Sequence, residues 1–327
     1  MKRLGADLAF AWDPPGRRIR RTRRWKKLPF VWPLQVAVVA AFWGACAALP
    51  AAWATRLGAW LGRTAGPQLR YYARVRQNLA MALPKASDAE LDRFAGAALA
   101  SLGATLAEYP HLGTVAQRAE VVIDAKLLAY ARRGRPAIFV TAHFGNWEIP
   151  TAAAATLGMR LSVVYRQKDN PLLEWLIQRC RRPLGCRYVP SHKGARPLLG
   201  ELRAGRSLAL LVDLRVESGD LLPFFGRPAH TTLVPARLAQ HVGCPLVPTR
   251  AERIGSSAHR VVIGAPIWPG RSIVDRDAQA RALTIRINQA IEAWITARPQ
   301  DWVSTHYRWP EAMRTAAIQE RARRRGQ

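Results

Sequence analysis

The sequence predicts an α/β fold: a mixed, mostly parallel sheet flanked by helices. Five short apolar runs rich in β-branched residues support this, and they lie at 136–142, 161–165, 207–212, 245–250 and 260–264. Helical segments fall between most of these runs. Strands that alternate with helices are typical of parallel sheets, because a parallel crossover is usually made by a helix.

The N-terminal part of the chain predicts a membrane anchor. Residues 17–27 hold eight basic residues, and residues 28–55 carry no charge. The uncharged stretch is longer than the ~20 residues that a helix needs to cross a bilayer. We therefore divide the chain into a basic cytoplasmic tail (1–27), an anchor helix (28–55), a catalytic domain (56–313) and a basic C-terminal tail (314–327).

A cleavable export signal is the alternative for this N-terminal segment. TRRWKKL followed by an apolar run resembles a twin-arginine signal. The long basic region before it, and a lysine where the signal prefers an aromatic residue, favour an anchor that is retained.

Residues 56–135 read as helical, with arginines between apolar residues at helical spacing. Ser87-Asp88-Ala89-Glu90 has the pattern of a capping box and opens one of these helices. The apolar face could lie in the membrane interface, with arginines that reach headgroup phosphates: Arg56, Arg63, Arg70, Arg74 and Arg76. A solvated basic helix packed on the core is the other interpretation.

The net charge of +28 over 327 residues favours an anionic partner. Nucleic acid, anionic lipid and an acidic carrier protein all fit this charge. The four cysteines form no C-x2-C pair and have no histidine at zinc-ligand spacing, so we expect free thiols, no metal and no other cofactor.

TAHFGNWEIP, at 141–150, is the strongest candidate for a catalytic motif. The strand should end at His143, and Asn146 is a good N-cap for a helix over Trp147–Leu157. Glu148, in the first turn of that helix, could then orient the imidazole of His143 and leave its other nitrogen free as a general base. A capped helix start with an incidental histidine is the alternative.

Two other charged residues follow predicted strands in the same way as His143. Arg166 comes after 161–165, and Asp213 comes after 207–212. Ligands of parallel sheets gather beyond the carboxyl ends of the strands. Asn170 followed by Pro171 predicts the N-cap and first residue of a helix whose last turn carries Arg181.

HFGNWE resembles the motif of the bacterial lipid A late acyltransferases, within the H-x4-D/E glycerolipid and lysophospholipid acyltransferases. Further blocks resemble this family in the same order, at 74–94, 164–181, 208–232 and 299–311. The resemblance covers roughly residues 55–312. It implies acyl transfer from an acyl carrier protein thioester to a hydroxyl of a lipid A precursor, without an enzyme nucleophile.

The resemblance also implies a site and a location. His143 and Glu148 would be catalytic, and the substrate-binding residues would be Arg166, Asn170, Arg181 and Asp213. The catalytic domain would lie on the cytoplasmic side of the bacterial inner membrane, in contact with membrane lipids.

The sequence departs from the family at Leu214 and at Ser304-Thr305-His306-Tyr307. These departures leave the identity of the acyl acceptor undecided more than the type of reaction. A lysophospholipid or an amino-lipid is the alternative acceptor. A basic nucleic-acid-binding protein would explain the charge but not HFGNWE, and no nucleic-acid-binding motif appears, so we expect no nucleic acid partner. Four histidines have no partner visible in the sequence: His192, His230, His241 and His259.

Overall fold

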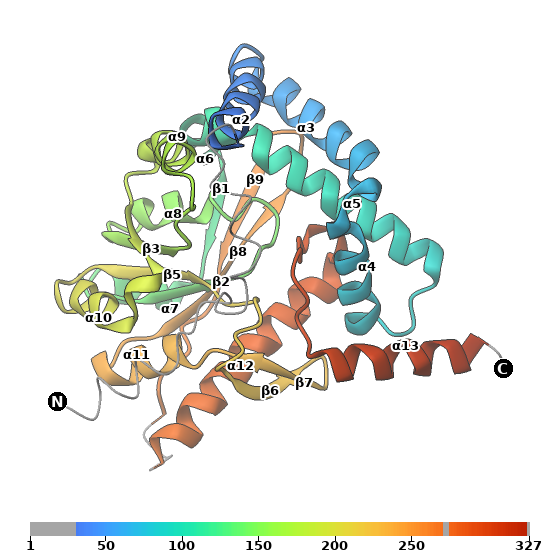
Figure 1. The fold of residues 1–327 in the computed structure, drawn as a ribbon. Helices are drawn as coiled ribbons and strands as arrows, with labels where there is room; N and C mark the ends of the chain where they lie inside the picture. Colours follow the sequence, from blue (N-terminus) through green and yellow to red (C-terminus); the bar gives the residue numbers. More distant parts are fainter. Residues whose placement is uncertain (1–30, 271–274, 326–327) are drawn as a thin grey trace.

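The structure is a computed structural model that describes residues 31–270 and 275–325 (Figure 1). A seven-stranded sheet lies at its centre, in the order β1-β9-β8-β2-β5-β3-β4. All neighbours pair in parallel except β8 and β9. The strands are β1 (Glu120–Ile123), β2 (Ile138–Thr141), β3 (Leu161–Tyr165), β4 (Arg187–Pro190), β5 (Ser207–Leu211), β8 (Leu246–Arg253) and β9 (His259–Ile263). The predicted mixed, mostly parallel sheet is confirmed, and each predicted apolar run forms a strand.

Two strands of the sheet and a two-stranded hairpin lie outside the five apolar runs identified in the sequence. β1 and β4 lie at its two edges, are only four residues long and are partly exposed, so they lack a continuous apolar run. β6 (Asp220–Phe224) and β7 (Arg227–Thr231) form a separate antiparallel hairpin. Phe225 and Gly226 turn between them with positive φ angles of 51° and 69°, as expected for a two-residue hairpin turn.

Helices cover both faces of the sheet. Ile138 and Val140 of β2 point into one core, and Phe139 between them points into the other. This alternation gives the central strand an apolar side chain on each face. The helices after β1 are α7 (Ala125–Ala131), α8 (Pro150–Thr156), α9 (Pro171–Arg181), α10 (Ala195–Arg203), α11 (Val234–Val242), α12 (Arg276–Ala297) and α13 (Glu311–Arg325).

The helices before β1 show that the predicted anchor segment is not a single helix. They are α2 (Val31–Ala47), α3 (Ala51–Ala65), α4 (Arg70–Ala82), α5 (Asp88–Ala107) and α6 (Leu112–Gln117). Residues 28–55 are therefore not one helix: the chain turns before Pro50, whose ψ of 143° is extended. Proline cannot donate the helical hydrogen bond, which explains the break. Among the described residues, no helix is long and apolar enough to cross a membrane; residues 28–30 lie outside that part.

Glycines let α3 and α5 pack with their backbones in contact. A Cβ atom on Gly58 would clash with the carbonyl oxygen of Gly103, and one on Gly62 would clash with that of Leu99. The capping box at the start of α5 is confirmed, since Ser87 and Glu90 each bind the other's backbone N–H. The first turn of α5 is thus stabilised by its cap, and the helix runs to Ala107, directly before Glu108.

Candidate active site

The loop after β2 holds His143 in a defined position. The backbone N–H of Val303 donates to the carbonyl oxygen of His143 at 2.7 Å, and that of Gly145 donates to the carbonyl of Asp301 at 2.8 Å. Gly145 has a φ of 56°, and a Cβ there would clash with the carbonyl oxygen of Ala251. The glycine of HFGNWE is therefore required by both its backbone angle and its contact with β8.

Asp213 is the carboxylate that contacts His143. Its Oδ1 lies 2.9 Å from Nδ1 of the imidazole, and its Oδ2 accepts the His143 backbone N–H at 3.1 Å and the Trp302 Nε1–H at 3.0 Å. Burial alone would raise the pKa of Asp213, but the charge of His143 and these hydrogen bonds hold it below its usual value. The carboxylate thus fixes Nδ1 of His143, and Nε2 is left to act on a substrate.

Glu148 does not orient His143, which corrects the prediction from the sequence. Its buried carboxylate accepts hydrogen bonds from Arg181 Nε at 3.0 Å, Arg181 Nη2 at 2.5 Å and the Tyr109 hydroxyl at 2.9 Å. The physical reason lies in the local backbone: residues 147–149 form a turn, and α8 begins only at Pro150. Glu148 is therefore directed toward the end of α9.

Arg181 is held inside the protein by the same cluster. Its guanidinium lies 5.6 Å from the ring centre of Tyr165 and 5.0 Å from that of Tyr188, in addition to the paired contact with Glu148. Its side chain is only 13% exposed. Its predicted substrate-binding role stays a prediction, and no signal in the sequence pointed to Tyr109 and Tyr188 as its neighbours.

Both asparagines singled out in the sequence serve the fold. Asn170 caps α9 as predicted, and its amide donates to the Trp32 carbonyl and to Gln35 of α2 at 3.2 and 3.1 Å. It is buried and tethers α9 to α2, and its predicted substrate contact stays a prediction. Asn146 does not cap α8, since its Oδ1 accepts the Glu148 backbone N–H at 3.1 Å within the turn.

Two arginines, Arg74 and Arg166, lie near His306, which also interacts with His143. Arg166 follows β3 as predicted, and its side chain is exposed. Desolvation and the charges of His143, Arg74 and Arg166 lower the pKa of His306. We call Arg74 and Arg166 the rim, and their positive charge is suited to an anionic substrate or partner.

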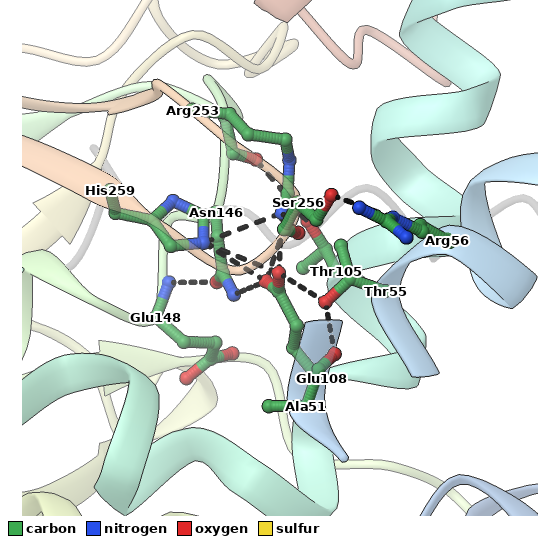
Figure 2. Close-up of polar contacts among 11 residues, drawn as sticks. Ala51, Thr55, Arg56, Thr105, Glu108, Asn146, Glu148, Arg253, Ser256 and His259 are labelled. Carbon is green, nitrogen blue, oxygen red and sulfur yellow. Dashed lines mark hydrogen bonds and ion pairs between the residues drawn. The ribbon is translucent and has the colours of Figure 1, made fainter. Parts of the chain in front are cut away.

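A buried polar network supports the other side of the loop (Figure 2). Glu108, at the end of α5, accepts hydrogen bonds from Asn146 at 2.7 Å and from Thr55 of α3 at 3.0 Å. Arg253 and His259 also contact this carboxylate. Burial raises its pKa, but His259 and Arg253 outweigh that effect and lower the pKa to about 2. The sequence contains no local signal for this network, because His259 lies 151 positions from Glu108.

An apolar cavity of about 20 Å³ lies beside the catalytic loop. Its lining includes Trp147, whose ring stands edge-on to the His143 imidazole with 5.1 Å between ring centres. Phe139, Leu161 and Val163 close it from the sheet. A cavity of this size is a packing void between the loop and the sheet, too small to hold an acyl chain.

The sequence of this chain is similar to those of known acyltransferases. A family model for bacterial lipid A biosynthesis acyltransferases matches residues 26–311. A phosphatidylinositol mannoside acyltransferase from Mycobacterium tuberculosis is 29% identical over 265 residues, covering 73% of this chain and 79% of that protein. The lipid A biosynthesis myristoyltransferase of Escherichia coli K12 is 24% identical over 256 residues, covering 76% of each chain.

A solved structure, the 1-acyl-sn-glycerophosphate acyltransferase PlsC from Thermotoga maritima, aligns over 58% of this chain and 81% of that one. Its TM-score of 0.34 and identity of 14% are too low to bear on the fold. The family assignment rests instead on the family model, which covers most of the chain, including the loop after β2 with His143, Asp213 after β5 and the segment around Trp302. The chain therefore belongs to the bacterial lipid A biosynthesis acyltransferase family, and it is an acyltransferase.

Proposed function

We propose that this protein transfers a fatty acyl chain from an acyl carrier protein thioester to a hydroxyl of a lipid A precursor, with His143 as the general base. The observation that carries this mechanism is the 2.9 Å contact between His143 Nδ1 and Asp213 Oδ1 at the carboxyl edge of the sheet. Asp213 takes the orienting role that we first expected of Glu148.

The reaction needs no covalent enzyme intermediate. His143 Nε2 accepts the proton of the acceptor hydroxyl while the oxygen attacks the thioester carbonyl carbon. The C–S bond then breaks, the ester is formed, and the imidazolium returns the proton to the departing thiolate. Asp213 stabilises the positive imidazolium between these two steps, as the buried carboxylate does in other His–Asp pairs.

The charge of the rim supports an acidic donor protein. Arg74 and Arg166 interact with His306, as His143 does, and the whole chain carries a net charge of +28. Carrier proteins are strongly acidic, so opposite charges would raise the encounter rate and make it sensitive to salt. Coenzyme A thioesters lack such an acidic surface.

We propose a location at the inner membrane, with the active site on the cytoplasmic side, and the surface of α2 and α3 supports the membrane contact. Leu34 and Val38 of α2 and Trp53 and Trp60 of α3 are each about 60% exposed. Large exposed apolar side chains close together are typical of membrane or protein contacts, and tryptophan favours the membrane–water interface. We therefore propose contact with membrane lipids through these two helices.

A second acceptor class is favoured by one comparison. The phosphatidylinositol mannoside acyltransferase of Mycobacterium tuberculosis is at least as similar to this chain as the lipid A enzymes are. Another lipid that carries a free hydroxyl, such as a lysophospholipid, an amino-lipid or a glycosylated phospholipid, would use the same base and the same proton transfers. The acyl transfer chemistry is common to both candidates.

Two measurements test the proposal. Mass spectrometry of lipids from a strain that lacks the protein should show loss of one acyl chain from lipid A, whereas loss from another lipid class would establish the second acceptor. Purified protein should use acyl carrier protein thioesters better than coenzyme A thioesters of the same chain length at low salt, and the difference should shrink at high salt. Equal efficiency with both donors at every salt concentration would refute the proposed donor.

A further inference from the structure

A second cavity lies away from His143, between α3, α5 and the β8–β9 hairpin. It has a volume of about 240 Å³. We call it the Arg56–Arg63 pocket. Its lining includes Arg56 and Arg63 from α3, Ser101 from α5, and Arg253 and Ser256 from the hairpin region. Neither of the two rim residues lines it, and neither do His143 and Asp213.

The charge in this pocket is positive. Arg63 makes no side-chain hydrogen bond or ion pair within the described residues, and the contact found for Arg56 is with the neutral Ser256 hydroxyl, at 3.1 Å from Nε. Asp301 also lines the pocket, but its Oδ2 lies 2.5 Å from Nε of Arg298, so its charge is already paired. The charge of Arg253 is likewise paired with that of Glu108. Two arginines thus remain without an acidic partner.

Two buried polar atoms in the pocket wall lack partners. Ser101 is 6% exposed, and its Oγ makes no hydrogen bond within the described part of the chain. The buried Nε of Arg253 is likewise unpaired there, although both of its terminal nitrogens bind Glu108. Buried polar atoms normally have partners, so unsatisfied ones on a cavity wall point to a polar ligand.

The position of the pocket identifies the kind of ligand. Trp53, Arg56, Trp60 and Arg63 are spaced by three and four residues, so they share one face of α3. Both tryptophans are about 60% exposed, and Arg56 lies 5.4 Å from the ring centre of Trp53. Interfacial tryptophans alternating with arginines are suited to a bilayer surface, where an anionic headgroup lies beside the apolar chains.

We propose that the Arg56–Arg63 pocket binds the phosphate of an anionic phospholipid headgroup. Arg56 and Arg63 supply the charge, and the Ser101 hydroxyl donates a hydrogen bond to a phosphate oxygen. The inner wall of the pocket is Arg253, which holds Glu108 and through it Asn146 of the catalytic loop. The bound lipid therefore lies against the network in Figure 2 and is distinct from the acyl acceptor at His143.

Binding can be measured without any acyl transfer, so the result is independent of the proposed function. The full-length protein in detergent is titrated with a short-chain phosphatidylglycerol below its micelle concentration, and the rise in unfolding temperature gives an apparent Kd. Inorganic phosphate and a short-chain phosphatidylcholine are titrated in parallel. We expect phosphatidylglycerol to bind most tightly.

The variants decide the assignment. R56Q/R63Q should weaken phosphatidylglycerol binding on the order of 30-fold, which is the loss of affinity expected when two arginines beside an anionic headgroup are removed. S101A should weaken this binding several-fold. R286Q removes an exposed arginine of α12 and should bind as the wild type does. Unchanged binding by R56Q/R63Q would overturn the proposal. An equal response to inorganic phosphate would overturn the lipid assignment.

Discussion

His143 and Asp213 lie 70 positions apart in the chain, yet His143 Nδ1 is 2.9 Å from Asp213 Oδ1. The sheet produces this contact, because β2 and β5 are parallel neighbours with Thr141 opposite Leu211. Each residue follows its strand by the same two positions, so both emerge at the same edge. The pairing of base and carboxylate is therefore a consequence of strand register.

Asp213→Asn should lower turnover on the order of 10²–10⁴-fold, because the imidazolium loses its charged partner and the tautomer is no longer fixed. His143→Ala should cost at least as much. Single-turnover rates at saturating donor would measure both. Asp124→Asn is the matched control, since asparagine can still cap α7. Near-normal turnover in Asp213→Asn would contradict the role given to this carboxylate.

Glu148→Ala should mainly destabilise the protein, because it leaves the buried Arg181 without its counter-charge. Removing one partner of such a pair typically costs about 3–5 kcal/mol. Urea unfolding would measure it, with Glu120→Ala as the control at an exposed ion pair, where about 1 kcal/mol or less is expected. If Glu148→Ala unfolds like the wild type but has lost turnover, Glu148 acts in catalysis instead.

The Glu108 carboxylate should make the stability depend on acid pH. Its folded pKa of about 2 lies below the ordinary value of 4.5, so its stabilising effect is present above pH 4.5 and is lost as the pH falls toward 2. The effect is on the order of 3 kcal/mol. Free energies of unfolding from pH 6 to pH 3 should fall less steeply in Glu108→Gln than in the wild type. Parallel curves would contradict this assignment.

Gly62→Val should destabilise the contact between α3 and α5, since the new Cβ would meet the backbone carbonyl of Leu99. Overpacking of this kind costs about 1–3 kcal/mol. Gly96→Ala on α5 is the control: no atom lies within 4 Å of its Cβ position, so the higher helix propensity of alanine should stabilise the protein slightly. Thermal unfolding would separate the two. A stable Gly62→Val variant would show that the helices can move apart.

Local patterns in the sequence predicted several parts of this protein correctly. The five apolar runs became strands, Ser87 and Asn170 became helix caps, and the strand-end rule placed His143 and Asp213 at one edge of the sheet. These features depend on residues that are close together in the chain. A strand, a cap or a strand end is therefore visible in a short segment.

The wrong predictions each required knowledge of distant contacts or exact element boundaries. The anchor at 28–55 looked continuous by charge, but Pro50 and the packing of α3 on α5 divide it. Glu148 looked like the partner of His143 because it is five positions away, but the turn at 147–149 directs it to Arg181. Its neighbour Tyr109 comes from another helical segment.

The sequence by itself determined five strands of the sheet, the helix caps Ser87 and Asn170, and the candidate base, His143. Only the tertiary structure decided which carboxylate orients it, why Glu148 is buried, and how Glu108, Arg253 and His259 meet behind the catalytic loop. The physical reason is that local structure follows from interactions between near neighbours in the chain. A charge pair across 70 or more residues depends on how the strands are ordered in the sheet and how the helices pack on it.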